Sequence, residues 1–246
     1  MTSSIPRSLR SSPPLILTAH GSADPRSSAT AFAIADQVRA RRPGLDVRSA
    51  FCEQTAPNLR DVLTQVPEHA VVTPLLLASA HHARVDIPST IQASGTRIRQ
   101  ADVLGEDPRL VAVMRQRLAQ AGVSPRDRGV GVVVVAVGSS WDAANVHTAD
   151  VADALADGTA WAAATTAFAT GAKPSVAAAV ARLRRRGAAR VIIAPWFLAH
   201  GRITDRVAAF ARSNGMPMSE PLGAHPLVAE TVLERFDRAV AEREAA

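Results

Sequence analysis

The chain has 246 residues, of which 47% are hydrophobic, and its formal net charge is +6. This length suffices for one large domain or two ordinary ones, and the hydrophobic content suffices for a buried core. A single cysteine, Cys52, excludes an internal disulfide and every paired-cysteine motif, so we expect a cytoplasmic protein. Residues 1–13 are rich in Ser, Pro and Arg without an apolar segment, which predicts a flexible tail rather than a secretory signal.

Almost all the positive charges are arginines, and Lys173 is the single lysine. Arginine binds carboxylates through two parallel N–H donors, so this bias suits a polyanionic ligand. A GC-rich genome produces the same bias and is the simpler explanation. No basic run with interleaved aromatic residues occurs, and no apolar run approaches the roughly 18 residues of a membrane span. The sequence therefore predicts neither nucleic-acid nor membrane binding.

Strand-like and helix-like segments alternate along the chain. Apolar, β-branched runs predict buried strands at residues 15–18, 70–77, 130–137 and 190–198. Apolar residues recur at helical spacing over residues 110–118, 176–183 and 228–240. This alternation predicts an α/β fold built of βαβ units, with mostly parallel four-stranded sheets flanked by helices.

The two halves of the chain repeat each other. Residues 15–22 align with residues 132–139, which places His20 opposite Val137 at an offset of 117 (137 − 20). Three further matches follow in the same order at offsets between 117 and 121. We therefore expect an N-terminal domain over residues 14–124 and a C-terminal domain over residues 125–246, facing each other across a cleft.

Three side chains of the first half follow successive predicted strands. His20 follows the first strand, Glu53 the second and His82 the third. In a parallel sheet ordered 2-1-3, the carboxyl ends of these strands meet at one edge, about 4.8 Å apart. Two imidazoles and a carboxylate form a plausible site for Fe²⁺, Co²⁺ or Ni²⁺.

The repeat separates these candidates from structural residues. Val137, Thr170 and Gly201 stand in the places of His20, Glu53 and His82. The second half therefore lacks all three candidate ligands. Other polar residues persist in both halves, and we interpret them as helix caps or loop-orienting groups: Ser22 with Ser139, and Asp86 with Asp205. The sequence thus predicts one active half and one half retained for its shape.

The predicted site suits the transfer of a metal ion. Two His and one Glu leave coordination positions open, whereas a closed four-ligand cage would hold the ion as structure. Imidazole also changes its charge near neutral pH, so His20 or His82 could accept a proton as well as bind the metal. The sequence does not divide these roles between them.

Several other functions lack their motifs. A histidine phosphatase needs an Arg before its catalytic His, and Ala19 stands there. The Gly-Lys pair of a P-loop, the glycine pattern of a dinucleotide site and the Gly-x-Ser-x-Gly of a serine hydrolase are all missing from the sequence. A carrier that binds the metal without catalysis needs the same ligands as an enzyme and remains an alternative.

The predicted strand ends of the first half lie within a set of short motifs: Ala-His-Gly-Ser at 19–22, Phe-Cys-Glu at 51–53 with Pro57, Pro-Leu-Leu-Leu at 74–77, His-Ala-Arg-Val-Asp-Ile-Pro at 82–88 and Leu104-Gly105 with Pro108. Together these motifs resemble the sirohydrochlorin chelatase family of ATP-independent enzymes. The resemblance extends over residues 14–120, and the second half is similar to the degenerate half of the long, two-domain members. Two departures are the extra His81 beside His82, and His200 where a proline is more usual.

The resemblance implies insertion of Fe²⁺ into sirohydrochlorin to give sirohaem. The alternatives are cobalt insertion for cobalamin synthesis and a non-catalytic carrier of the metal or the tetrapyrrole. It implies that His20 and His82 bind the metal with Glu53 as their acidic partner, and that no cofactor is permanently bound. The substrate would be a polycarboxylated tetrapyrrole held between the lobes of a monomer. The residues expected to contact it are Ser22, Arg26, Arg84, Ser139, Arg202 and Arg206.

Overall fold

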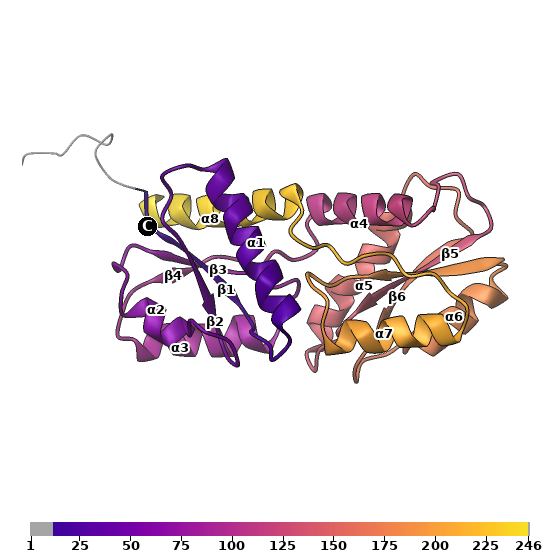
Figure 1. Ribbon diagram of the computed structural model, residues 1–246, viewed down its shortest axis with the longest axis horizontal. Helices are drawn as coiled ribbons and strands as arrows, with labels where there is room; N and C mark the ends of the chain where they lie inside the picture. The colour runs from indigo at the N-terminus through magenta and orange to yellow at the C-terminus, as the bar shows by residue number, and fades with distance from the viewer. Residues whose placement is uncertain (1–11, 246) are drawn as a thin grey trace, which may run out of the picture.

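The computed structural model describes residues 12–245, which form two α/β lobes side by side (Figure 1). The sheet of the first lobe has the order β2-β1-β3-β4, and all its strand pairs are parallel. Its strands are β1 (Leu15–Ala19), β2 (Val47–Phe51), β3 (Val71–Pro74) and β4 (Arg99–Gln100). The predicted fold class and the predicted 2-1-3 strand order are therefore confirmed. Residues 1–11 of the predicted tail lie outside the described residues.

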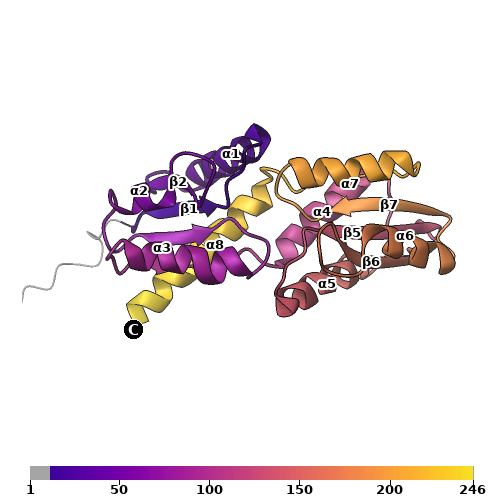
Figure 2. The same cartoon turned by 90° about the horizontal axis from the view of Figure 1, so that it is seen from below.

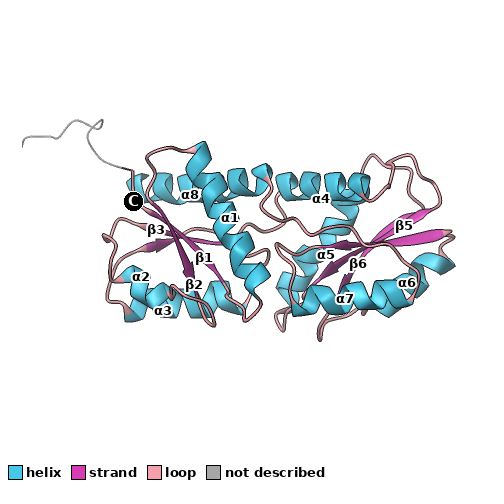
Figure 3. Ribbon diagram, in the orientation of Figure 1, coloured by secondary structure: helices cyan, strands magenta, loops and turns pink. Residues whose placement is uncertain are grey.

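Helices cover both faces of the first sheet (Figure 3). Leu15 and Leu17 point to one face and Ile16 to the other, and each belongs to a buried apolar cluster. The helices that follow these strands are α1 (Pro25–Arg41), α2 (Leu59–Leu63), the π-helical turn η2 (His82–Asp86) and α3 (Ile87–Ala93). Asp24 caps α1 by accepting the N–H of Arg26, and Pro25 supplies a first helical position that needs no donor.

The second lobe repeats this plan with one strand fewer. Its sheet has the order β6-β5-β7, formed by β5 (Val130–Ala136), β6 (Ala163–Phe168) and β7 (Arg190–Pro195). The expected fourth strand is reduced to a single parallel bridge between Ile193 and Met218. Pro217 precedes Met218 and has no N–H to donate, so a longer ladder cannot form there. The helices are α5 (Asp142–Ala156), α6 (Val176–Arg185) and α7 (Arg202–Ser213).

The two lobes exchange their last helices. Helix α4 (Pro108–Gln120) comes from the first half of the sequence but packs against α5 and β7, and α8 (Pro226–Ala245) comes from the second half but packs against α1 and β3. Both views show α8 on the first lobe and α4 on the second (Figures 1 and 2). The two halves of the sequence therefore do not coincide with the two lobes in space.

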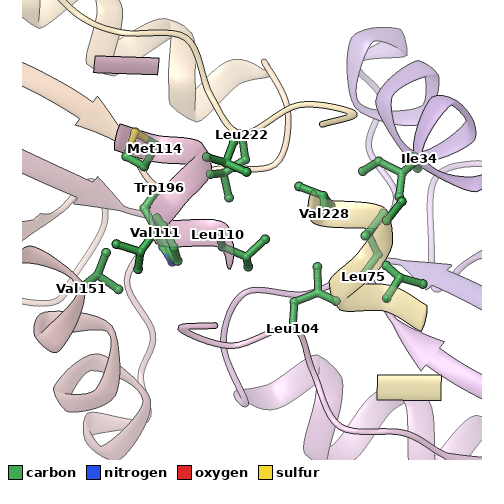
Figure 4. Packing of buried hydrophobic residues seen from close by; sticks show 14 of the residues in the cluster. Ile34, Leu75, Leu104, Leu110, Val111, Met114, Val151, Trp196, Leu222 and Val228 are labelled. Carbon is green, nitrogen blue, oxygen red and sulfur yellow. The ribbon is translucent and has the colours of Figure 1, made fainter. Parts of the chain in front are cut away.

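This exchange makes one apolar core continuous through both lobes. Leu110, Val111 and Met114 of α4 lie beside Val151 and Trp196 of the second lobe (Figure 4). On the other side, Val228 of α8 lies beside Ile34 and Leu75 of the first lobe (Figure 4). The lobes are thus joined by buried side chains as well as by the chain itself, which fixes the cleft between them.

No helix within residues 12–245 is both long and apolar enough to span a bilayer.

Candidate functional site

The first part of the site is a sharp turn where β1 ends at Ala19. Gly21 adopts φ +97°, and a Cβ built there would lie 1.8 Å from the carbonyl oxygen of Glu53. Glycine is therefore the residue that permits this close approach. Beside it, the N–H of Glu53 donates to the carbonyl of His20 at 3.0 Å. The turn after β1 and the loop after β2 are thus locked together, which brings His20 and Glu53 side by side.

The structure brings His20 and His82 into direct contact. Their ring centroids lie 3.8 Å apart with an interplanar angle of 54°. Nδ1 of His20 is 3.3 Å from Oε1 of Glu53. The residues predicted from three successive strand ends therefore converge at one edge of the first sheet.

Asp86 is a further member of the site, and it was interpreted from the sequence as a structural residue. Its Oδ2 lies 2.5 Å from Nδ1 of His82, and its Oδ1 lies 3.4 Å from Nε2 of His81. The contact with His82 could have been predicted from the sequence, because residues four apart on a helical turn share a face. Asp86 contacts both histidines, but only His82 faces His20. The His81 ring lies 6.2 Å from that of His82 and is exposed.

Each imidazole of the pair faces a carboxylate on one side and the solvent on the other. Both Nδ1 atoms are buried beside a carboxylate but lack the geometry of a hydrogen bond. The side chains of His20 and His82 are nevertheless 41% and 35% exposed, so their other ring atoms are the accessible ones. A carboxylate behind an imidazole orients the ring and raises its basicity as a metal ligand.

Glu53 lies beside His20, at the distance given above, and its predicted role as a metal ligand stays a prediction. Among residues 12–245, no three His, Cys, Asp or Glu side chains form a group that could hold a metal ion by themselves. The assembled unit is therefore the pair of imidazoles, each backed by its own carboxylate. Cys52 lies nearby, but burial, with the negative charges of Asp86 and Glu53, raises its pKa to about 11, so its thiol remains protonated at neutral pH.

The two imidazoles open into a cleft of about 720 Å³ between the lobes. A cavity of this size accommodates a large organic ligand. Much of its lining is apolar. The apolar wall residues include Leu75, Leu76 and Leu77 from the first lobe, and Val137, Phe197 and Leu198 from the second. The cleft can therefore receive a large and mainly apolar molecule beside the histidine pair.

The predicted substrate-contacting residues divide into those that line the cleft and those that do not. Ser22, Ser139 and Arg202 line it. Arg26 and Arg84 instead join the two lobes: Arg26 pairs with Asp205 of α7, and Arg84 lies 5.3 Å from the ring centroid of Trp141. Arg206 is exposed on α7 and lies outside the cleft lining.

The two serines do not occupy the helix-capping position expected for them. The Oγ of Ser22 accepts the N–H of Asp24, and the Oγ of Ser139 accepts the N–H of Trp141. Each serine therefore stabilises the turn two residues before the helix cap. Asp24, and not Ser22, caps α1, because its side chain reaches the N–H of Arg26.

The second lobe has the same backbone at the equivalent edge but different side chains. The N–H of Thr170 donates to the carbonyl of Val137 at 2.9 Å, as Glu53 does to His20. Gly138 takes φ +93°, like Gly21. The turn is therefore retained, while Val137 and Gly201 place no imidazole there. The asymmetry predicted from the repeat is present in three dimensions.

Comparisons with known proteins agree with this architecture. The family model CbiX matches residues 14–121 and again residues 131–239. The chain is 26% identical over 166 residues to a sirohydrochlorin ferrochelatase of Priestia megaterium, a match that spans 64% of this chain and 62% of that protein. It is 22% identical over 241 residues to a sirohydrochlorin cobaltochelatase of the same organism, over 91% of this chain and 78% of that protein.

Solved structures share the two-lobed fold. SirB from Bacillus subtilis with Fe³⁺ superposes with a TM-score of 0.81 at 22% identity, over 94% of this chain and 96% of that one. CbiX, described as the terminal enzyme for biosynthesis of siroheme in denitrifying bacteria, superposes with a TM-score of 0.69 at 25% identity, over 92% of this chain and 99% of that one. Because one family model matches both halves, the chain belongs to the CbiX family, the sirohydrochlorin chelatases that its motifs resemble.

Proposed function

We propose that this protein is a sirohydrochlorin chelatase that inserts Fe²⁺ into sirohydrochlorin, without ATP, to form sirohaem. The observation that carries the proposal is the contact between His20 and His82, whose accessible edges open into a cleft built by both lobes. Family membership supports the reaction class, and the names of the two Priestia megaterium relatives support the substrate.

In this proposal His20 and His82 bind the incoming metal ion. Two nitrogen ligands leave most of the coordination sphere to water and to the pyrrole nitrogens, so the ion is exchangeable. Glu53 and Asp86 act from behind the rings and hold the ligating edges toward the cleft. The ion is transferred when pyrrole nitrogens replace the imidazoles.

The tetrapyrrole lies between the lobes, with its apolar faces against the leucines of the first lobe and against Val137 and Phe197 of the second. Its carboxylates need cationic or hydroxyl partners at the rim. Arg202, Ser22 and Ser139 line the cleft and provide them, while Arg84 and Arg206 lie outside the cleft lining. Arg26 is a weaker candidate because Asp24 and Asp205 already bind it.

Iron is our choice of metal, and cobalt is the second candidate. Nitrogen ligands accept both ions, so the donor atoms do not discriminate strongly between them. One relative is named a ferrochelatase and the other a cobaltochelatase, which supports both ions. Complementation of one strain blocked in sirohaem synthesis and of another blocked in cobalamin synthesis tests the choice: we expect rescue of the first.

The test of the activity itself is anaerobic incubation of the purified protein with Fe²⁺ and sirohydrochlorin, without ATP, followed by absorbance. The proposal predicts many turnovers per protein molecule. A single stoichiometric burst would indicate a carrier, and no spectral change would contradict both functions.

A further inference from the structure

One imidazole lines the cleft from the second lobe, across from the histidine pair. His200 lies between β7 and α7, on the second lobe, and borders the same cleft as His20 and His82. Its Nε2 is 2.8 Å from Oε2 of Glu220, which lies after the bridge at Met218. The metal-binding role proposed above uses neither residue.

The contact with Glu220 determines what His200 can do chemically. A carboxylate accepts hydrogen bonds and does not donate them, so the proton of a neutral imidazole resides on the Nε2 that faces Glu220. The Nδ1 of His200 then carries the free lone pair. A carboxylate that holds an imidazole in this tautomer also stabilises the imidazolium formed when the ring takes up a proton.

The pair is not simply retained from the first half of the sequence. The offset that joins Asp86 to Asp205 joins His81 to His200, since 205 − 86 and 200 − 81 are both 119. In the first half Asp86 contacts His81, but Asp205 is bound to Arg26. The carboxylate beside His200 is therefore supplied by a different segment. A histidine–carboxylate pair is thus present on a lobe whose metal-binding histidines are replaced.

Metal insertion releases protons that such a group can accept. Formation of the product breaks two pyrrole N–H bonds and releases two protons for each divalent ion inserted. An imidazole bound to the metal has its lone pair in the metal–nitrogen bond, so it cannot accept a proton at the same time. With the ion delivered from the first lobe, a base on the opposite wall can take a proton from the other face of the macrocycle.

We propose that His200, oriented by Glu220, accepts one of these protons, an inference that rests on the proposed chelatase function. As a pyrrole nitrogen bonds to the metal, its N–H bond breaks and the proton moves to Nδ1 of His200. Glu220 is exposed, so the imidazolium then loses its proton to bulk water. The second proton leaves to water or to the imidazole that the metal has just vacated.

Charges around His200 come from several elements. On its own lobe they are Glu220 and, on α7, Asp205 and Arg202; across the cleft they are His20, Glu53, His81 and His82. The pKa of Asp205 is lowered chiefly by its hydrogen bond with Arg26. Side chains of both charges therefore surround His200 and Glu220, and the test below compares variants of these two residues.

The test uses His200→Gln, Glu220→Gln and, as a matched control, His69→Gln, all in the full chain. His69 precedes β3, at the edge of the first sheet away from the cleft, and does not line it. We expect His200→Gln to lower kcat about 100-fold, in the range of a lost general base, with KM for sirohydrochlorin unchanged. Glu220→Gln should lower kcat about 10-fold, because the imidazole loses its orienting carboxylate. The control should match the unmodified protein.

Three further readouts separate this role from a structural one. The fall of kcat on the acid side of the pH profile should disappear or move in His200→Gln, exogenous imidazole should restore part of the activity of His200→Ala, and Co²⁺ binding without tetrapyrrole should not change. If His200→Gln does not fold, Glu220→Gln, on an exposed loop, gives the same test. Full kcat with an unchanged pH profile in both variants would contradict the role of His200 as a proton acceptor and leave the proposed chelatase function intact. No turnover by the unmodified protein would contradict the chelatase proposal itself.

Discussion

Arg26 at the start of α1 and Asp205 on α7 form a two-pronged ion pair between the lobes. The NH1–Oδ1 and NH2–Oδ2 distances are 3.2 and 2.6 Å, and Asp24 holds the same guanidinium from its other side. Arg26 keeps the pKa of Asp24 at about 2 and lowers that of Asp205, mainly through its hydrogen bonds with each. The pair therefore remains charged throughout the pH range in which a chelatase is assayed.

Removing this pair should alter substrate binding more than folding. The side chains of Arg26 and Asp205 are 48% and 51% exposed, and exposed ion pairs contribute little to stability. We expect Asp205→Asn to raise KM for sirohydrochlorin several-fold, because the lobes are held less firmly, with little change in the thermal unfolding midpoint. Asp36→Asn removes another exposed pair of α1 and is the control. An unchanged KM in Asp205→Asn would show that the pair does not position the lobes.

The second carboxylate bound to Arg26, that of Asp24, predicts a pH dependence of stability. A carboxyl group whose folded pKa is depressed contributes stability above its unfolded pKa and loses it as the pH falls through the folded value. For Asp24 this window extends from its ordinary value of 3.8 down to about 2. The midpoint difference between the unmodified protein and Asp24→Asn should therefore be constant above pH 5 and shrink below pH 4. A difference that changes between pH 6 and 8 would contradict this account.

One largely buried arginine, Arg235, joins the exchanged helix α8 to the segment that precedes α4. Arg235 donates to the carbonyls of Val103 and Leu104 and to Asp107, with side-chain exposures of 12% for Arg235 and 8% for Asp107. Without Arg235 the buried carboxylate of Asp107 keeps only its longer pair with Arg109, at 3.4 Å, so we expect Arg235→Ala to lower the free energy of unfolding by about 3 kcal/mol. Arg238→Ala, exposed on the same helix, should cost less than about 1 kcal/mol. Urea denaturation compares the two, and equal losses would refute the prediction.

Gly21 provides a sharper probe of the turn beneath His20. A methyl group there would meet the Glu53 carbonyl at 1.8 Å, whereas Gly44 has a similar φ of +90° with open space around it. Gly44→Ala should cost only the backbone penalty of about 1 kcal/mol. Gly21→Ala must also separate the two loops, so it should lower kcat by more than 10-fold and destabilise more than Gly44→Ala does. Equal behaviour of the two variants would show that the close approach is unimportant.

Glu106 lies at the junction between the first lobe and α5, where Thr148 of α5 contacts it. Burial raises its pKa, although Thr148 of α5 donates a hydrogen bond to it at 3.0 Å. A carboxyl group with a raised folded pKa costs stability as the pH rises through the interval between its unfolded and folded values. Glu106→Gln keeps an acceptor for Thr148 without the charge, so at pH 7 it should melt at a higher temperature than the unmodified protein. At pH 4 the difference should vanish, and a lower midpoint at pH 7 would contradict the assignment.

The histidine pair could be predicted from the sequence because runs of apolar residues show where the buried strands end. His20 and His82 follow buried runs, and parallel strands place their carboxyl ends at one edge. The exchange of α4 and α8 was not predictable in this way, because apolar spacing shows that a helix face is buried but not which sheet buries it. The fourth strand of the second lobe is shortened to one bridge beside Pro217. The repeat predicted four strands in each half, so the effect of this proline was missed.

Asp86 and Arg26 show the same limit at the site. Asp86 and Asp205 match in the repeat, yet one contacts histidines and the other binds an arginine 179 residues away. Persistence in both halves indicated a structural role for both aspartates, and the structure gives each a different partner. Long-range pairing between side chains is set by the fold and is not visible in the local pattern.

The central claim is that His20 and His82 together bind the metal that is inserted. The most direct measurement is Co²⁺ affinity and anaerobic turnover with sirohydrochlorin for the double variant His20→Ala, His82→Ala, beside the neighbouring variant His81→Ala. The account predicts that the double variant loses at least 100-fold in affinity and all measurable turnover, while His81→Ala retains both. Full turnover by the double variant, or equal losses in His81→Ala, would contradict it.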